Sequence, residues 1–193
     1  MKTTDETCSF QSRTSLVVQH SAGRDGSALS ALSIAKALQT TQRVCVFLGN
    51  EGPMLHEFRK AGVVSELIPH KSWMRSDRWL RLAKIIWRQR EEVRRLEVAI
   101  RKVNPDVIYV NTMASLAAVF AARRLKIPVV WHLREQFRCS GGEMLFPRAA
   151  VHWWRRYTLR NVAGIIANTK ESAESLLASR LATAPPAWPV PIS

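Results

Sequence analysis

The feature that most constrains the fold is a repeated alternation of short apolar runs with longer stretches of helical spacing. Six runs rich in β-branched residues are predicted to be strands: Ser15–Gln19, Arg43–Gly49, Ser65–Pro69, Val107–Asn111, Pro128–His132 and Gly164–Asn168. Runs that stay apolar along their whole length are typical of strands buried on both faces, as in a parallel sheet covered by helices. The sequence therefore predicts an α/β fold with a doubly wound, Rossmann-like parallel sheet of about six strands in the order 3-2-1-4-5-6.

The chain is long enough for one domain with a complete hydrophobic core and two short terminal segments. We expect the domain to span residues 15–178, because strand and helix patterns alternate throughout that range. Residues 1–14 are polar and are expected to be disordered. Residues 179–193 hold four of the nine prolines, which cannot occupy a helix interior or a central strand. This last segment is predicted to be a proline-rich tail or a truncated linker.

Cysteine use and hydropathy indicate a reducing compartment and no membrane span. The three cysteines, Cys8, Cys45 and Cys139, lie far apart and form no Cys-x-x-Cys pair, which argues against a disulfide framework or a zinc site. The polar N-terminus lacks the apolar core of a signal peptide, and no run approaches the ~18–20 apolar residues that cross a bilayer. We therefore expect a cytoplasmic protein without a metal site.

The net charge of +14, from 29 basic and 15 acidic side chains, favours a polyanionic partner. Residues 71–102 contribute half of this excess, and three tryptophans accompany the arginines there. Arginine beside tryptophan suits an anionic membrane surface, where indole rings lie at headgroup depth. We predict that Trp79, Arg81 and Arg88 face such a membrane, so that the protein associates peripherally with its inner face. The alternative is a solvated helix face with the tryptophans in the core.

A glycine-bearing loop follows the first predicted strand and leads into a helix. Gly23 and Gly26 precede the first turn of that helix, whose free N–H groups and positive dipole end suit an anion. Gly26 lacks a Cβ where a phosphate would approach most closely, and Ser27 can cap the helix or donate to the phosphate. This spacing leaves two interpretations open, a phosphate-binding loop and a plain turn capped by Ser27.

Polar side chains follow the fourth and fifth strands, at the sheet edge that also carries the first loop. Asn111 and Thr112 can either hydrogen-bond a ligand or cap the next helix. After the fifth strand come His132, Arg134 and Glu135. A histidine can carry a proton, an arginine can bind phosphate or carboxylate, and a glutamate can orient a sugar hydroxyl. We expect this cluster to serve a ligand site, with a structural role for His132 as the alternative.

Five segments occur in an order that is similar to a known family: GRDGSALSALSIAKAL, PMLHEFRKAGV, IRKVNPDVIYVNT, IPVVWHLREQF and GIIANTKESAESL. This ordered set, from about Ser15 to Leu177, resembles the N-terminal, acceptor-side domain of family 4 glycosyltransferases, enzymes of the two-domain GT-B type. The resemblance implies retaining transfer of a sugar from a nucleotide-sugar donor to a saccharide or lipid-linked acceptor, with no essential metal and no further cofactor. The expected fold is then one half-domain of a GT-B enzyme.

The resemblance also implies roles for individual residues. The donor-phosphate loop corresponds to Gly23, Gly26 and Ser27. The catalytic positions correspond to His132 and Glu135. The expected contacts to the acceptor or sugar come from His20, Asn111, Thr112 and Arg134. In the family the donor loop often carries adjacent glycines, whereas this chain has Arg24 and Asp25 before Gly26.

The family's second domain, which supplies the nucleotide pocket, has no counterpart in this sequence. We therefore expect the chain to be inactive alone, as a fragment or as one subunit beside a separate donor-binding polypeptide. A basic nucleic-acid- or anionic-surface-binding module without catalysis is the alternative, although no recognised nucleic-acid-binding signature accompanies the charge. A Rossmann oxidoreductase ranks lower, because the third glycine of the dinucleotide fingerprint is missing.

Overall fold

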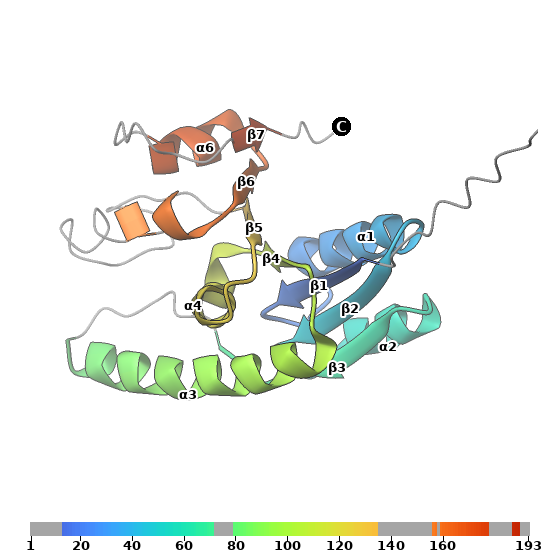
Figure 1. The fold of residues 1–193 in the computed structure, drawn as a ribbon, viewed down its shortest axis with the longest axis horizontal. Helices are drawn as coiled ribbons and strands as arrows, with labels where there is room; N and C mark the ends of the chain where they lie inside the picture. The colour runs from blue at the N-terminus through green and yellow to red at the C-terminus, as the bar shows by residue number, and fades with distance from the viewer. Residues whose placement is uncertain (1–12, 72–78, 135–155, 158, 178–186, 190–193) are drawn as a thin grey trace, which may run out of the picture.

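The computed structural model describes residues 13–71, 79–134, 156–157, 159–177 and 187–189, in which strands and helices alternate (Figure 1). The strands are β1 (Thr14–Gln19), β2 (Arg43–Leu48), β3 (Val64–Leu67), β4 (Val107–Asn111), β5 (Val129–Leu133), β6 (Gly164–Ala167) and β7 (Ala187–Pro189). The helices are α1 (Gly26–Gln39), α2 (Pro53–Lys60), α3 (Trp79–Val103), the short 3-10 helix η1 (Met113–Ser115), α4 (Leu116–Arg124) and α6 (Lys170–Leu177).

The strands form one parallel sheet in the order β3-β2-β1-β4-β5-β6-β7. The doubly wound order predicted for the first six strands is confirmed. The seventh strand, β7, pairs with β6 at the edge of the sheet, within the segment for which a tail was expected. It ends at Pro189, and a proline without an N–H group is tolerated on an edge strand because one side of that strand needs no ladder partner.

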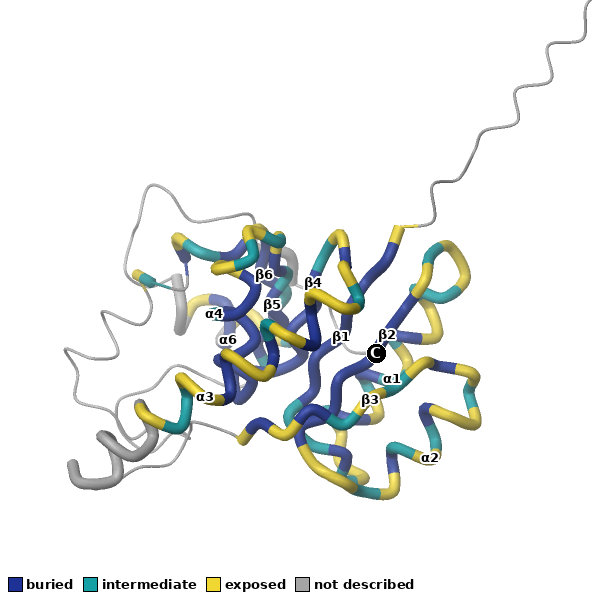
Figure 2. The backbone as a smooth tube through the Cα atoms, turned by 60° about the horizontal axis from the view of Figure 1, so that its bottom comes forward, coloured by how far each residue is buried: buried dark blue, intermediate teal, exposed yellow. Residues whose placement is uncertain are grey.

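The sheet lies between two layers of helices, and each layer buries its own apolar core (Figure 2). Helices α1 and α2 pack on one face, where Val17 and Phe58 are fully buried. Helices α3 and α4 pack on the other face, where Leu16 and Trp131 are fully buried. Leu16 and Val17 contact opposite layers because successive side chains of a strand point to opposite sides of the sheet. Burial on both sides explains why the strand runs are apolar throughout.

Helix α3 extends beyond the sheet (Figure 1). It has 25 residues, so it is about 37 Å long, whereas a six-residue strand spans about 20 Å. The loop directly after β3 contacts the helix at Glu92, through the N–H group of Lys71. The turns of α3 that precede Glu92 therefore lie past the edge formed by the carboxyl ends of the strands.

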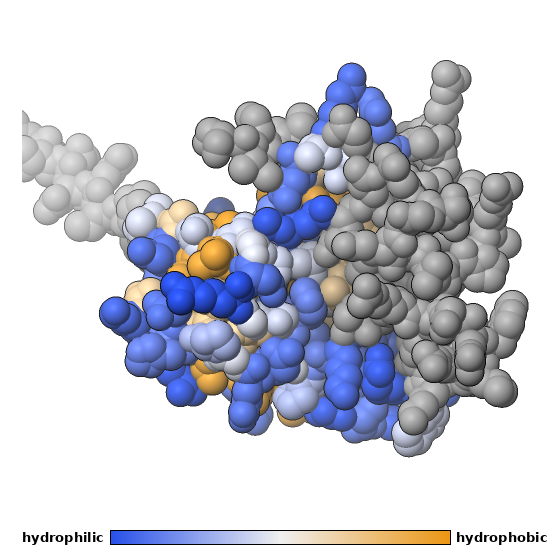
Figure 3. Space-filling view, turned by 180° about the vertical axis from the view of Figure 1, so that it is seen from behind, coloured by the Kyte–Doolittle hydropathy of each residue, from blue (hydrophilic) through white to orange (hydrophobic). Residues whose placement is uncertain are grey.

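The described surface is mostly hydrophilic on the side seen in Figure 3, with apolar residues in small groups. The large apolar side chains that are exposed in the described ranges are Leu29, Val64, Trp87 and Val98. None of the described helices is both long and apolar enough to cross a membrane.

Candidate functional site

The chain reverses its direction of sheet growth between β1 and β4, which are neighbours at the centre of the sheet. In open α/β sheets, ligands bind in the crevice outside the carboxyl ends of the strands at such a point. Three loops meet there with the ends of the strands that precede them. They follow β1, β4 and β5, at residues 20–25, 112–113 and 134. We call this edge the carboxyl rim.

Asp25 caps helix α1, which begins at Gly26. Its Oδ1 atom accepts hydrogen bonds from Ser27 N and Ala28 N, both at 2.9 Å, and from Ser27 Oγ at 2.6 Å. Burial opposes ionisation of Asp25, but these hydrogen bonds outweigh it and hold its pKa below the usual value. The cap is therefore Asp25 and not Ser27. In this structure its carboxylate occupies two of the N–H groups that we expected to be open to a phosphate.

The closest backbone approaches lie in the loop after β2, and not at the predicted glycine. A Cβ at Gly26 would meet no atom within 4 Å. A Cβ at Gly49 would collide with the backbone carbonyl oxygen of His20, and one at Gly52 with that of Ala22. Glycine at these two positions lets the loop after β2 support the loop after β1.

Asn111, at the end of β4, connects the elements of the rim by hydrogen bonds beneath its surface. Its Nδ2 donates hydrogen bonds to Gln19 Oε1 and to the backbone oxygen of Ser27, each at 2.8 Å. Gln19 Nε2 in turn donates to Ser27 Oγ at 2.7 Å. Asn111 is fully buried, and within the described residues its Oδ1 has no hydrogen-bond partner. Its amide therefore joins β1, β4 and α1 beneath the surface of the rim.

His20 and Thr112 meet across the crevice, at the ends of β1 and β4. Thr112 Oγ1 lies 3.2 Å from His20 Nδ1 and also accepts from Ala114 N at 3.2 Å, so this hydroxyl links the imidazole to the start of η1. Burial lowers the pKa of His20, while the Asp25 carboxylate partly opposes this. In the tautomer whose Nδ1 accepts from Thr112, the neutral ring carries its proton on Nε2, which has no hydrogen-bond partner among the described residues. This Nε2–H group, on a half-buried side chain, can donate to a ligand.

Thr112 has an unusual backbone conformation. Its φ is 140°, a value that β-branched residues rarely adopt. The indole of Trp131, which is fully buried, donates from Nε1 to the carbonyl oxygen of Thr112 at 2.8 Å and holds this conformation in place. Strained residues of this kind are concentrated at functional sites, because only a well-determined surrounding structure maintains them.

His132 lies between Tyr109 of β4 and Asn168, which follows β6. The Tyr109 hydroxyl is 2.5 Å from Nδ1, and Asn168 Oδ1 is 2.5 Å from Nε2. Because an amide oxygen only accepts, Nε2 carries the proton and Nδ1 accepts from the Tyr109 hydroxyl. Burial lowers the pKa of His132; the hydrogen bond to Asn168 opposes this, and the Arg134 cation adds to it. The residue predicted to be catalytic is thus a neutral, buried imidazole with both ring nitrogens hydrogen-bonded.

Arg134 reaches from the end of β5 to the start of α1. Its Nη2 donates to the carbonyl oxygen of Gly26 at 3.4 Å, and the side chain is partly exposed. A cation therefore lies beside the first turn of α1, on the rim. Glu135, which was predicted to act with His132, lies outside the described residues.

His70, which sequence reasoning missed, is buried under the rim. Its Nδ1 donates to Ile68 O at 2.8 Å, and its Nε2 lies 3.4 Å from Ser115 Oγ, from which it accepts. Burial lowers the pKa of His70 to about 4, and the neighbouring His20 contributes to the lowering. The two histidines do not form a metal site: within the described ranges, no group of three His, Cys, Asp or Glu side chains is arranged to hold an ion.

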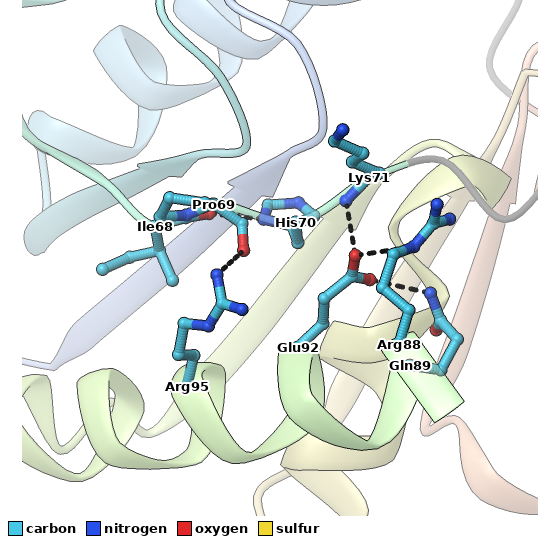
Figure 4. A network of polar contacts seen from close by, with 8 residues as sticks. All are labelled: Ile68, Pro69, His70, Lys71, Arg88, Gln89, Glu92 and Arg95. Carbon is cyan, nitrogen blue, oxygen red and sulfur yellow. Dashed lines mark hydrogen bonds and ion pairs between the residues drawn. The ribbon is translucent and has the colours of Figure 1, made fainter. Parts of the chain in front are cut away.

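A buried carboxylate on α3 fastens the loop that carries His70 (Figure 4). Glu92 is 2% exposed and accepts hydrogen bonds from Gln89 Nε2 at 2.8 Å and from Lys71 N at 3.3 Å. Arg88 Nε pairs with the same carboxylate at 3.1 Å. Burial raises the pKa of Glu92, and the Arg88 cation opposes this rise. Glu92 therefore links α3 to the loop after β3 through the N–H group of Lys71, while Gln89 and Arg88 of the same helix hold its carboxylate.

The residues predicted to face a membrane all belong to α3. The side chains of Trp79 and Arg81 lie outside the described part of the structure. Arg88 is partly buried and points toward Glu92 (Figure 4). On the outer side of the same helix, Trp87 is 75% exposed, so the alternative of a tryptophan in the core is wrong for this residue.

Sequence reasoning missed five residues that complete or support the rim: Asp25, His70, Glu92, Tyr109 and Asn168. Two of them carried a signal in the sequence. Asp25 stands directly before Gly-Ser at a helix start, which is a common N-cap arrangement, and Asn168 comes directly after an apolar run, as Asn111 does in the sequence. Tyr109 carried none, because its partner His132 lies on a different strand and the contact depends on the register of β4 against β5.

Residues 25–191, most of the chain, match the family model described as a glycosyl transferase 4-like domain. The chain belongs to this family. The family resemblance noted in the sequence is therefore confirmed. No curated protein sequence matches this glycosyl transferase 4-like domain at a significant level.

Solved glycosyltransferase structures share the fold of this glycosyl transferase 4-like domain. HepE of Anabaena, in complex with UDP and glucose, has 18% sequence identity and a TM-score of 0.64, covering 92% of this chain and 44% of HepE. MurG of Acinetobacter baumannii has 15% identity and a TM-score of 0.55, covering 83% of this chain and 42% of MurG. UGT2 of Phytolacca americana, complexed with UDP-2fluoro-glucose and pterostilbene, has 13% identity and a TM-score of 0.60, covering 94% and 54%. The chain thus spans about half of each protein, and at these identities the likeness shows the fold alone.

Proposed function

We propose that this domain binds the acceptor in a glycosyltransferase that moves a sugar from a nucleotide-sugar donor to a saccharide or lipid-linked acceptor. The family match over residues 25–191 is the observation that carries the proposal. The position of the carboxyl rim supports it, because ligands of such sheets bind at this edge. Among the proteins that share the fold, HepE was solved with UDP and glucose and UGT2 with UDP-2fluoro-glucose and pterostilbene.

The rim offers the groups that a sugar acceptor requires. Saccharide hydroxyls both donate and accept hydrogen bonds, and the Nε2–H of a neutral His20 can donate to one of them. Thr112 holds that imidazole by its other nitrogen. Arg134 supplies a cation that can bind the phosphate of a lipid-linked acceptor or of the donor. We assign Asn111 to the framework beneath these contacts.

We also propose the catalytic and donor-phosphate roles that the family resemblance implies. His132 acts at the catalytic centre with Glu135, and Tyr109 and Asn168 keep its ring in one orientation. The loop of residues 23–27 approaches the donor diphosphate. In this structure the Asp25 carboxylate accepts hydrogen bonds from two of the first N–H groups of α1. It therefore has to turn away before these N–H groups can contact the diphosphate.

Donor binding is assigned to a second domain, supplied by a longer form of the polypeptide or by a separate subunit. The coverage of only 44% of HepE and 42% of MurG supports this division. The experiment is a transfer assay in which the purified chain is incubated with UDP-glucose and a set of saccharide and lipid-linked acceptors. We expect no transfer and no measurable UDP-glucose binding by calorimetry. Robust sugar transfer by the chain alone would contradict the division of roles.

We also propose that the outer face of α3 attaches the domain to the anionic inner surface of a membrane. Arg90 and Arg94 are exposed and follow Trp87 by three and seven residues, so the three side chains share one side of the helix. This face combines an amphipathic ring with cations, which suits the headgroup region. A lipid-linked acceptor would then be held near the rim by the same membrane.

A further inference from the structure

A second basic site lies at the opposite edge of the sheet from the carboxyl rim. Arg123 stands in the last turn of α4, shortly before β5 begins. Arg156 and Arg160 stand on helical residues that shortly precede β6. Both segments therefore end near the amino ends of their strands. Together with Tyr157 and Asn161, the three arginines line a surface pocket of about 420 Å³, which we call the arginine pocket.

Tyr157 organises this pocket. Arg123 Nη1 donates to the Tyr157 hydroxyl at 2.9 Å, and its guanidinium carbon lies 5.2 Å from the centre of the tyrosine ring. The ring also packs against Phe120, with centroids 5.2 Å apart, and Asn161 Nδ2 donates to the backbone oxygen of Tyr157 at 2.6 Å. The tyrosine thus orients the planar guanidinium of Arg123 while engaging one of its five N–H groups.

The positive charge of the arginine pocket has no counter-charge in the described part of the chain. Arg156 and Arg160 are four residues apart, a spacing at which like charges on a helix repel. Glu97 of α3 is the carboxylate that pairs with neighbouring cations, and it pairs with Arg124 at 2.8 Å and with Arg101 at 3.8 Å. No acidic side chain is found among the described residues that line the pocket. Three arginines that line one pocket, with no carboxylate among its described lining residues, favour the binding of an anion.

We propose that the arginine pocket binds a phosphoryl group. Guanidinium groups match the oxygens of a phosphate through paired hydrogen bonds, and a phosphate dianion offsets more of the charge than a carboxylate does. The pocket is in the size range of small-molecule sites, so the ligand carries atoms beyond a single phosphate, as a diphosphate or a phosphorylated headgroup does. Because the pocket lies across the sheet from the rim, this ligand is neither the sugar donor nor the acceptor of the proposed reaction.

The test uses the full chain with inorganic pyrophosphate as the probe. Titration calorimetry at low ionic strength compares the unmodified chain with the double variant R156Q/R160Q, whose substituted side chains are both exposed. We expect binding to weaken at least tenfold in this variant, with an unchanged urea midpoint as proof that it is folded. The matched control R59Q/K60Q removes the same charge from the exposed end of α2 and should keep the original affinity. Equal affinities of the two double variants, or no binding by the unmodified chain, would overturn the proposal.

A second arm distinguishes a lipid headgroup from a soluble phosphate compound. Cosedimentation is measured with phosphatidylcholine vesicles that contain or lack phosphatidic acid. If a headgroup fills the arginine pocket, R156Q/R160Q reduces binding to the phosphatidic acid vesicles and pyrophosphate competes with them. If a soluble compound fills it, pyrophosphate binding depends on the two arginines while vesicle binding equals that of the unmodified chain. If R156Q/R160Q changes neither pyrophosphate binding nor vesicle binding, the arginine pocket is not a phosphoryl-binding site.

Discussion

The hydroxyl of Tyr109 and the Nδ1 atom of His132 lie 2.5 Å apart, and both side chains are buried at the centre of the sheet. Their rings meet edge to face, with centroids 5.8 Å apart. With Asn168 at Nε2, this contact fixes the imidazole in one tautomer and one orientation. Both ring nitrogens are thus engaged within the protein, so a ligand that hydrogen-bonds to Nε2 has to replace Asn168.

Tyr109→Phe is expected to destabilise the protein. The change leaves Nδ1 of His132 buried without a donor, which costs about 1–3 kcal/mol. The measurement is the free energy of unfolding in urea at pH 7. Ser33→Ala, an exposed position on α1, is the control and should change it by less than about 0.5 kcal/mol. If the two variants were equally stable, the contact would contribute nothing to the fold.

The burial of neutral His70 predicts a loss of stability in acid. Its pKa is lowered to about 4, so the unfolded chain binds a proton at a higher pH than the folded protein does. The stability contributed by the neutral ring is complete above pH 6.5 and is lost as the pH falls toward 4, by up to roughly 1.4 kcal/mol per pH unit. Urea unfolding at pH 7 and at pH 4.5 gives the free energy of unfolding that is lost in acid. This loss should be about 2 kcal/mol smaller in His70→Asn than in the unmodified protein. His56→Asn, at an exposed position on α2, should lose as much as the unmodified protein. If all three proteins lost the same free energy of unfolding, His70 would not be the source of the acid sensitivity.

Glu92→Ala is expected to loosen the loop that carries His70. Without the carboxylate, the N–H group of Lys71 loses its acceptor and Arg88 loses its ion-pair partner. Hydrogen exchange at the Lys71 amide should become about tenfold faster, which corresponds to about 1.4 kcal/mol. Glu91→Ala removes an exposed carboxylate one residue earlier and should leave that rate unchanged. Unchanged exchange in Glu92→Ala would show that the loop is held by other contacts.

The membrane proposal predicts that the outer face of α3 controls vesicle binding. Arg90→Gln and Arg94→Gln should each weaken binding to phosphatidylglycerol vesicles by roughly fivefold, because a basic residue near such a surface contributes about 1 kcal/mol. Binding should also fall as salt is added. Arg59→Gln, on α2 at the other face of the sheet, is the control. Vesicle binding that is lost equally in Arg59→Gln would indicate a nonspecific effect of net charge.

The fold could be predicted largely from the sequence, because strands buried on both faces leave a continuous apolar pattern. The run from Val107 to Asn111 is an example: Ile108, Tyr109 and Val110 each pack on one face or the other, so the buried pattern continues up to Asn111. Strand β7 could not be predicted in this way. It has only three residues and follows two prolines, so it depends on pairing with β6 and not on its own pattern.

The candidate site was only partly readable from the sequence. The positions of His20, Thr112 and Arg134 follow from the topology, since carboxyl ends of parallel strands meet at one edge. Their hydrogen bonds do not follow from it. The cap at Asp25 shows why: two competing groups, a carboxylate and a phosphate, suit the same N–H groups, and the sequence alone does not decide between them.

The measurement that tests the central claim most directly is amide chemical-shift mapping by NMR on the isotope-labelled chain during titration with saccharide and lipid-linked acceptors. We predict that the perturbed amides gather on the carboxyl rim, in the loops around His20, Thr112 and Arg134, and that His20→Ala weakens the binding about tenfold. Perturbations confined to other surfaces, or equal binding by His20→Ala, would contradict the assignment of the rim as the acceptor site.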